Sequence, residues 1–215
     1  MHIFLDTANI EQIRDAVRLG VISGVTTNPT LVSKETGAYR DLIREICSIV
    51  PGSVSAEVLG ETAAEMVSEA REIVTWATNI AVKIPATAAG LEATAILARE
   101  DIKVNFTLCF SLNQALLAAL AGATYVSPFV GRLDDAGHDG MALVKEIVEV
   151  YNHYGFETQV IAASIRHTRH CVLAAQAGSH IATVPHQVLM QMIRHPLTDA
   201  GVERFRNDFK ASLKS

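Results

Sequence analysis

One lysine and two carboxylates stand out in this sequence because each comes late in a short run of apolar and β-branched residues. They are Lys83, Asp6 and Glu57. Burial disfavours the charged form of an amine, so a lysine in a dry interior can supply a neutral nucleophile that forms an imine with a carbonyl compound. Carboxylates beside it can act as general acid and base. These residues favour imine chemistry. The alternative is a structural lysine in a salt bridge with Asp6 or Glu57.

Lys83 is a better candidate for the nucleophile than Lys103, which lies in another such run. Lys83 comes near the end of its run, just before Pro85, whereas Lys103 begins one. If the runs are β-strands, a residue four positions from the end lies about 13 Å below it. We therefore expect Lys83, and not Lys103, to reach a site at the ends of the strands.

Hydroxyl, amide and guanidinium side chains accompany the lysine in similar positions. The hydroxyl and amide residues are Thr26, Asn28, Asn105, Thr107, Ser127 and Ser164. Arg132 and Arg166 follow the ends of their runs, and a guanidinium group can hold phosphate through two parallel hydrogen bonds. Together with the lysine, they indicate a phosphorylated carbonyl substrate. His138, His167 and His170 lie nearby in segments that we expect to be exposed loops.

The same inventory does not predict a metal site. Two carboxylates bind magnesium only weakly, and no histidine joins Asp6 and Glu57 from a strand end. The ammonium group of Lys83 would also repel a cation. We expect no metal.

These residues need a scaffold that brings the ends of many strands together, and the sequence has a periodic pattern that predicts one. Short β-branched runs alternate with longer amphipathic or alanine-rich stretches, at a period of very roughly 25 residues. The predicted strands are 3–6, 24–28, 53–58, 80–84, 103–107, 125–129, 159–164 and 180–184. The predicted helices are 10–19, 39–50, 62–77, 90–99, 112–121, 140–154, 168–177 and 187–195. Glycines at the expected left-handed cap position follow four of them, namely Gly20, Gly122, Gly155 and Gly178.

Strict alternation of strands and helices predicts a parallel sheet covered by helices. Eight units without a long interruption favour a closed α/β barrel, the (β/α)8 or TIM barrel, over an open sheet. The chain has 215 residues, which is short for a fold of about 250 residues. No linker or change of composition divides it, so we expect one domain over residues 1–215.

The polar residues of the predicted strands share one face. Side chains alternate between the two faces of a strand, and in segment 103–108 one face carries Asn105 and Thr107 while the other is apolar. The apolar face must pack on the helices, so the polar face points into the barrel. We expect Ser164 and Arg166 to lie on this inward face too. Polar groups crowd toward the carboxyl ends of the strands, where barrel enzymes place their active sites. Without a ligand or water, many of them would be unpaired.

A final segment, residues 196–215, exceeds the eight units. Val202, Phe205, Phe209 and Leu213 form a narrow apolar stripe on an otherwise charged helix. One interpretation is a helix that closes the bottom or rim of the barrel. The other is an arm that packs on a neighbouring subunit.

Composition excludes several classes of function. A net charge of −5 argues against nucleic-acid binding. No apolar run is long enough to predict a membrane span, and the first residues do not resemble a signal peptide. The three cysteines are far apart, as is typical of a reducing compartment, so we expect a cytoplasmic protein.

Several strings in order carry a resemblance to a known family. They are residues 4–9 (FLDTAN), 24–29 (GVTTNP), 82–85 (VKIP), 105–108 (NFTL), 122–135 (GATYVSPFVGRLDD) and 162–166 (AASIR). Over essentially all of its length the chain resembles the small transaldolase branch of the transaldolase/fructose-6-phosphate aldolase family.

The resemblance implies a role for each site residue. Lys83 would form the Schiff base and Asp6 would be the general acid/base for carbon–carbon cleavage. Glu57 and Thr107 would hold a water that shuttles protons. The implied substrate-binding residues are Thr26, Asn28, Asn105, Ser127, Phe129, Arg132, Ser164 and Arg166, with phosphate on the two arginines.

The implied reaction moves a dihydroxyacetone unit from sedoheptulose 7-phosphate to glyceraldehyde 3-phosphate, giving erythrose 4-phosphate and fructose 6-phosphate. This is a step of the pentose phosphate pathway, and it needs no cofactor because the protonated imine is the electron sink. Relatives form pentameric rings paired into decamers, which implies a homo-oligomer.

Two residues favour transfer over lysis. The aldolase relatives tend to carry Gln at the position of Glu57 and Tyr at that of Phe129. A carboxylate can exchange a proton with the shuttling water, whereas an amide only orients it. A fructose-6-phosphate aldolase is the second hypothesis. The third is a non-catalytic barrel that binds sugar phosphates.

Overall fold

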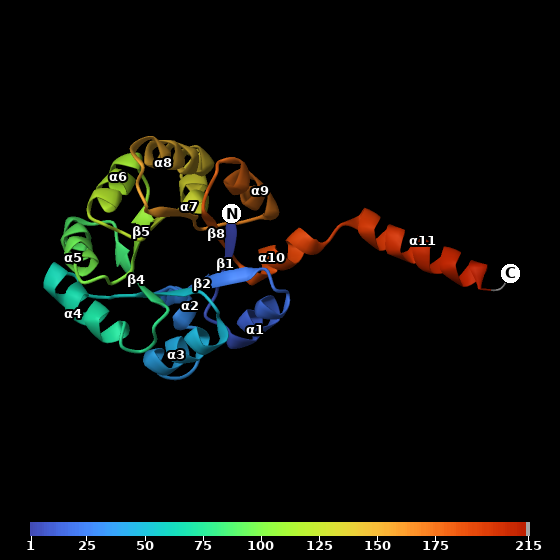
Figure 1. The fold of residues 1–215 in the computed structure, drawn as a ribbon, viewed down its shortest axis with the longest axis horizontal. Helices are drawn as coiled ribbons and strands as arrows, with labels where there is room; N and C mark the ends of the chain where they lie inside the picture. Colours follow the sequence, from blue (N-terminus) through green and yellow to red (C-terminus); the bar gives the residue numbers. More distant parts are fainter. Residues whose placement is uncertain (214–215) are drawn as a thin grey trace.

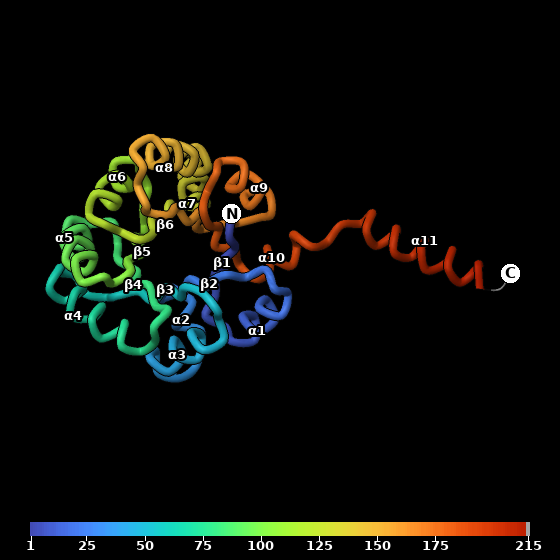
Figure 2. The backbone as a smooth tube through the Cα atoms, in the orientation of Figure 1, coloured from blue at the N-terminus to red at the C-terminus, as the bar shows by residue number. Residues whose placement is uncertain are grey.

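The chain folds into a closed barrel of parallel strands with helices around it, as the computed structural model shows for residues 1–213 (Figures 1 and 2). The strands are β1 His2–Asp6, β2 Ile22–Thr26, β3 Ser53–Glu57, β4 Ile80–Pro85, β5 Val104–Cys109, β6 Tyr125–Pro128, β7 Gln159–Ala162 and β8 Ile181–Val184. They follow one another in chain order around the barrel, and β1 pairs with β8 to close it. The predicted (β/α)8 fold is confirmed.

Eleven helices surround and extend this barrel within the described part of the chain. They are α1 Ile10–Arg18, α2 Pro29–Val32, α3 Tyr39–Ile49, α4 Ala63–Ile73, α5 Ala88–Ala98, α6 Leu112–Leu120, α7 Val130–Asp135, α8 Gly140–Tyr154, α9 Thr168–Gln176, α10 His186–Ile193 and α11 Pro196–Ser212. The predicted cap glycines all have positive φ, from +68° at Gly155 to +86° at Gly122. Glycine suits this position because it has no Cβ to clash in the left-handed conformation.

Two short helices, α2 and α7, were not predicted, and both begin at the carboxyl end of a strand. Asn28 is therefore not the last residue of a strand, as predicted, but the N-cap of α2. Its side-chain oxygen accepts a hydrogen bond from the backbone N–H of Leu31 at 2.9 Å. The helix is only one turn long, too short to leave a periodic apolar pattern in the sequence.

The seventh strand also differs from the prediction. It ends at Ala162, and Ile161 packs inside the barrel, so the inward face carries Ile161 and Ala163 rather than Ser164. Ser164 has φ +58°, a conformation that breaks the alternation of a strand. This turn, and not strand parity, decides where Ser164 and Arg166 point.

The apolar face of each strand packs under the helices in one continuous core. Val54, Val82, Val104 and Phe106 have 1% exposure or less. A separate cluster consists of Phe4, Ile161 and Ile181 with Tyr125 against them. In each case the residue two positions further along the chain, toward the carboxyl end of the strand, is Asp6, Ala163, Thr183 or Ser127. On the side of β1, β6, β7 and β8, the interior is therefore apolar below its polar mouth.

The C-terminal helix α11 extends away from the barrel (Figure 1), and none of its residues is buried. Phe205, Phe209 and Leu213 are 74%, 65% and 71% exposed. The interpretation that this segment closes the bottom or rim of the same barrel is therefore wrong. The last two predicted positions, Lys214 and Ser215, lie outside the described residues. No helix in the described range is long and apolar enough to cross a membrane.

Candidate active site

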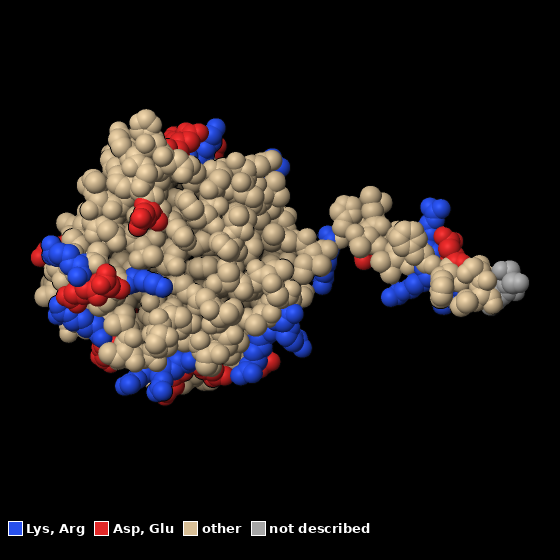
Figure 3. All heavy atoms as spheres, viewed as in Figure 1, with Lys and Arg blue, Asp and Glu red and all other residues tan. Residues whose placement is uncertain are grey.

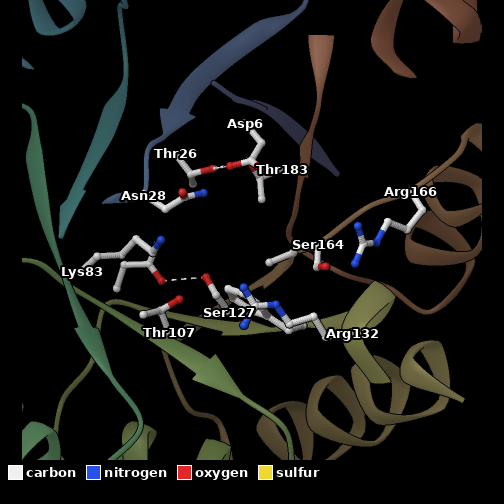
Figure 4. Close-up of a pocket in the computed structure, with 13 residues that line it drawn as sticks. Asp6, Thr26, Asn28, Lys83, Thr107, Ser127, Arg132, Ser164, Arg166 and Thr183 are labelled. Atoms are coloured by element: carbon white, nitrogen blue, oxygen red, sulfur yellow. Dashed lines mark hydrogen bonds between the residues drawn. The ribbon is translucent and has the colours of Figure 1, made fainter. Parts of the chain in front are cut away.

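A cavity of about 170 Å³ opens at the carboxyl ends of the strands. It is lined by Asp6, Thr26, Asn28, Lys83, Asn105, Thr107, Ser127, Phe129, Arg132, Ala163, Ser164, Arg166 and Thr183. Figure 4 shows these side chains, which come from strands and loops all around the barrel. All the predicted site residues except Glu57 are on this wall.

Lys83 reaches the cavity from β4, with its side chain only 6% exposed. Its Nζ lies 2.8 Å from Oε2 of Glu57 and donates a hydrogen bond to the backbone oxygen of Thr27 at 3.0 Å. The salt bridge with Glu57 considered as an alternative is therefore present. It does not exclude catalysis, because the carboxylate that holds the ammonium group is also a base within reach of its proton.

Glu57 lies beside the cavity rather than on its wall. The β3–β4 register pairs it with Lys83, which places the two side chains next to each other on the inner face. Its side chain is 14% exposed, and its backbone oxygen accepts a hydrogen bond from the hydroxyl of Tyr39 at 3.2 Å. Glu57 can therefore act on the cavity only through Lys83 or through a small molecule held between them.

Asp6 lies across the cavity, at the end of β1. Burial raises the pKa of this carboxyl, while a hydrogen bond from Thr26 and the charge of Lys83 lower it in part. Oγ1 of Thr26 donates to Oδ1 of Asp6 at 2.8 Å, and the β1–β2 register pairs the two residues. A buried carboxylate with a raised pKa is suited to take up and return a proton.

A chain of polar groups fixes the amide of Asn105. Ser127 donates to its Oδ1 at 2.7 Å, and its Nδ2 donates to Oγ of Ser55 at 3.0 Å. These contacts connect β3, β5 and β6 across the interior. On the other side, Asn28 uses its oxygen to cap α2, so its NH2 group remains to meet a ligand.

Thr107 is fully buried, and its hydroxyl has no hydrogen-bond partner among the described residues. Leaving a hydroxyl unpaired in a protein interior costs roughly 1–3 kcal/mol. The hydroxyl is on the cavity wall, so a polar molecule in the cavity is its natural partner.

Two arginines form the rim of the cavity. The guanidinium carbon of Arg132 lies 5.2 Å from the centre of the Phe129 ring, in a cation–π contact. Arg166 forms an ion pair with Asp135 at 2.7 Å, and its side chain is 52% exposed. It lies so close to Gly131 that a Cβ there would be 2.5 Å from its Nε. The glycine therefore makes room for the second guanidinium group.

Sequence reasoning missed two wall residues, Ala163 and Thr183. Thr183 is 3% exposed and lies late in β8. It follows the inward-facing Ile181 by two positions, so the period-two pattern could have identified it. Ala163 has no polar group to mark it.

Of the three histidines predicted in exposed loops, His138 and His167 are exposed and lie outside the helices, but the prediction was wrong for His170. His170 lies in α9 and is buried, with its Nε2 3.0 Å from Oδ2 of Asp134. Its Nδ1 accepts a hydrogen bond from the backbone N–H of Arg166 at 3.3 Å. Burial, as the largest cause, lowers the pKa of His170. The imidazole therefore supports the arginine loop from behind.

On the face of the molecule drawn in Figure 3, the charged groups do not form a single basic patch. On the face of the barrel in Figure 3, they gather mostly around the circumference, with both signs intermixed. Within the described residues, no three His, Cys, Asp or Glu side chains lie close enough together to form a metal site.

Comparison with known proteins places these residues in context. Residues 3–215 match the family model described as "Transaldolase/Fructose-6-phosphate aldolase". A "Probable transaldolase" of Dehalococcoides mccartyi is 62% identical over 216 residues, which covers 100% of both chains. Proteins with the same description from Heliobacterium modesticaldum and a Thermoanaerobacter species are 59% and 56% identical, over 98% and 100% of both chains respectively.

Proposed function

Since the chain belongs to the transaldolase/fructose-6-phosphate aldolase family, we propose that it is a transaldolase that uses Lys83 as a Schiff-base nucleophile. It transfers a dihydroxyacetone unit from sedoheptulose 7-phosphate to glyceraldehyde 3-phosphate, and the products are erythrose 4-phosphate and fructose 6-phosphate. The observation that carries the proposal is the position of Nζ of Lys83, on a polar cavity wall and 2.8 Å from a carboxylate.

The first step is attack of the Lys83 amine on the ketone carbon of the donor. Glu57 takes the proton that the amine must lose, since its Oε2 is the nearest carboxylate oxygen to Nζ. The carbinolamine then loses its hydroxyl group as water and becomes a protonated imine. The unpaired hydroxyl of Thr107 holds that water within reach of Glu57, in agreement with its missing partner.

Carbon–carbon cleavage follows on the far side of the cavity. Asp6 accepts the proton of the C4 hydroxyl, the C3–C4 bond breaks, and its electron pair moves into the protonated imine. The aldehyde product leaves, and the enamine on Lys83 attacks the carbonyl carbon of the acceptor. Asp6 then returns its proton to the new hydroxyl, which leaves the new ketose bound to Lys83 as a protonated imine. Addition of the water expelled in the first step hydrolyses this imine and releases the product and the free amine, so no cofactor takes part in the balance of atoms and electrons.

The remaining wall residues hold the substrate. Asn28, Asn105 and Ser127 bind the hydroxyl groups of the dihydroxyacetone unit. Thr26, Phe129 and Ser164 complete the wall around it. Arg132 and Arg166 bind the phosphate at the rim, where guanidinium groups can take it in bidentate fashion.

Glu57 and Phe129 favour transfer over release of free dihydroxyacetone. Phe129 has no hydroxyl group to bind a water in the cavity, and its ring packs edge-on against Phe110 at 5.8 Å. Keeping water away from the enamine gives the acceptor aldehyde time to react before a proton does. The fructose-6-phosphate aldolase hypothesis predicts instead that the enamine is protonated before an acceptor aldehyde reacts, so that free dihydroxyacetone is released.

Reduction with borohydride tests the mechanism. In the presence of fructose 6-phosphate, we expect a covalent three-carbon adduct on Lys83 after reduction, located by mass mapping of peptides. If no adduct forms on Lys83, the Schiff-base mechanism is wrong and the barrel only binds sugar phosphates.

A second measurement separates the two catalytic hypotheses. Free dihydroxyacetone is measured from fructose 6-phosphate with and without an acceptor aldehyde. Transaldolase activity requires the acceptor. Release at the rate of transfer without an acceptor would instead identify an aldolase.

We also propose the setting of this enzyme. It acts in the pentose phosphate pathway in the cytoplasm and assembles into a homo-oligomer, a pentamer or decamer. Support for the assembly comes from α11, Pro196–Ser212, which extends away from its own barrel with Val202, Phe205 and Phe209 exposed.

A further inference from the structure

Thr183 occupies a position on the cavity wall that the proposed mechanism does not use. Its side chain is 3% exposed, and its Oγ1 lies 2.5 Å from Oγ1 of Thr26. Thr26 in turn donates to Oδ1 of Asp6 at 2.8 Å. The three side chains come from β8, β2 and β1, which are neighbours where the barrel closes, and Figure 4 shows them side by side.

The donors and acceptors among Thr183, Thr26 and Asp6 follow from a count of their protons. An ionised carboxylate only accepts hydrogen bonds, so the single hydroxyl proton of Thr26 must go to Asp6. The oxygen of Thr26 is then an acceptor toward Thr183, and the proton between the two hydroxyls belongs to Thr183. The order is Thr183 to Thr26 to Asp6.

We propose that Thr183 is a positioning residue for Asp6, and this inference rests on the proposed role of Asp6 in cleavage. By donating to Thr26, Thr183 fixes the hydroxyl rotor of Thr26 so that its proton points at Oδ1. Oδ2 of Asp6 accepts no hydrogen bond from the described residues, so it is the oxygen that takes the substrate proton.

Removal of the Thr183 hydroxyl changes this order without changing the shape of the cavity. Valine has nearly the same volume as threonine but has no donor. In Thr183→Val, the Thr26 hydroxyl loses its fixed orientation and spends less time pointing at Asp6. Serine at the same position keeps the donor and loses only a methyl group.

The pKa of Asp6 responds to the hydrogen bond that Thr26 donates to it. The groups that face Asp6 are Thr26 from β2, whose hydrogen bond lowers its pKa, and Lys83 from β4, whose charge also lowers it. Weakening the Thr26 bond leaves burial less opposed, so the pKa of Asp6 rises further. Since Asp6 must be ionised to accept the C4 proton, the acid limb of kcat/KM moves to higher pH.

The test compares Thr183→Val with Thr183→Ser, Thr26→Val and the Thr26→Val/Thr183→Val double variant. We expect Thr183→Val to lower kcat roughly fivefold to tenfold, as for the loss of one hydrogen bond in the transition state, with little change in KM. Its acid limb should move to higher pH. Thr183→Ser should restore both values to within about twofold. The double variant should be no worse than Thr26→Val, because Thr183 acts only through Thr26.

Thr158 provides the matched control, since it is 5% exposed and its hydroxyl donates to the backbone oxygen of Ala123 at 2.7 Å, outside the cavity. Thr158→Val removes a buried hydroxyl and should leave the pH profile in place. A Thr183→Val enzyme with the wild-type profile, or additive effects in the double variant, would overturn the inference. Failure of the proposed function would be recognised by a different result: the wild-type protein would give no borohydride adduct on Lys83.

Discussion

The mouth and the bottom of the barrel are built from the same strands but follow opposite rules. At the bottom, Phe4, Ile161 and Ile181 form an apolar cluster. At the mouth, Lys83 and Asp6 are held in a polar wall at the cost of burying charge. In β1, a single residue, Leu5, separates Phe4 from Asp6, so the same inward face carries an apolar side chain below and the proposed proton acceptor above. Position along the strand, and not strand parity, separates the two tasks.

If this division holds, the largest effect on activity comes from the proposed nucleophile at the mouth. Lys83→Arg keeps the charge beside Glu57 but cannot form an imine, so we expect kcat to fall by roughly 10⁴-fold or more. Circular dichroism should show a folded barrel. Lys103→Arg, at an exposed position before β5, is the control and should keep full turnover. Substantial activity in Lys83→Arg would place the nucleophile elsewhere.

Asp6→Asn should lower activity without lowering stability, whereas a core mutation should lower stability more than activity. Loss of the proton acceptor should lower kcat about 10²–10⁴-fold, while the borohydride adduct with fructose 6-phosphate still forms. Because burial raises the folded pKa of Asp6 above 3.8, its stabilising contribution is present below that pH. It is lost as the pH rises through the raised folded value. At neutral pH the amide removes this penalty, so the melting temperature should not fall. A fall would mean that the ionised carboxylate stabilises the fold.

Phe4→Ala tests the bottom of the barrel. The Phe4 ring is 4% exposed and fills the space beside Gly24, where a Cβ would lie 2.5 Å from it. We expect the free energy of unfolding in urea to fall by about 3–5 kcal/mol, because a cavity is left behind. Activity per folded molecule should change less than the activity of either mouth variant. Leu120→Ala, at a 66% exposed position, is the control.

The smallest effect on the barrel should come from the stripe on α11. The double change Phe205→Ser/Phe209→Ser removes apolar side chains that are largely exposed in the single subunit. Sedimentation velocity should show a wild-type assembly larger than one 23.2 kDa chain and a variant shifted toward monomer. Lys210→Ser, on the same helix, should leave the assembly intact. A monomeric wild type would contradict the proposed arm.

The sequence by itself determined the fold class, the positions of the strands and most of the cavity wall. Hydrophobic periodicity is a local signal, and in a barrel it also fixes which side chains point inward. For that reason Asp6, Lys83, Asn105 and Thr107 could be assigned to one site from their parity and their place near strand ends.

Only the tertiary structure decided the rest. Ser164 lies on the wall because its left-handed turn overrides the parity of β7, and Asn28 because it caps a one-turn helix. The contact between Lys83 and Glu57 and the chain from Thr183 to Asp6 depend on strand register, which sets distances between residues far apart in the sequence. A sequence pattern gives the direction of a side chain. Its partner is decided when the strands pair and the barrel closes.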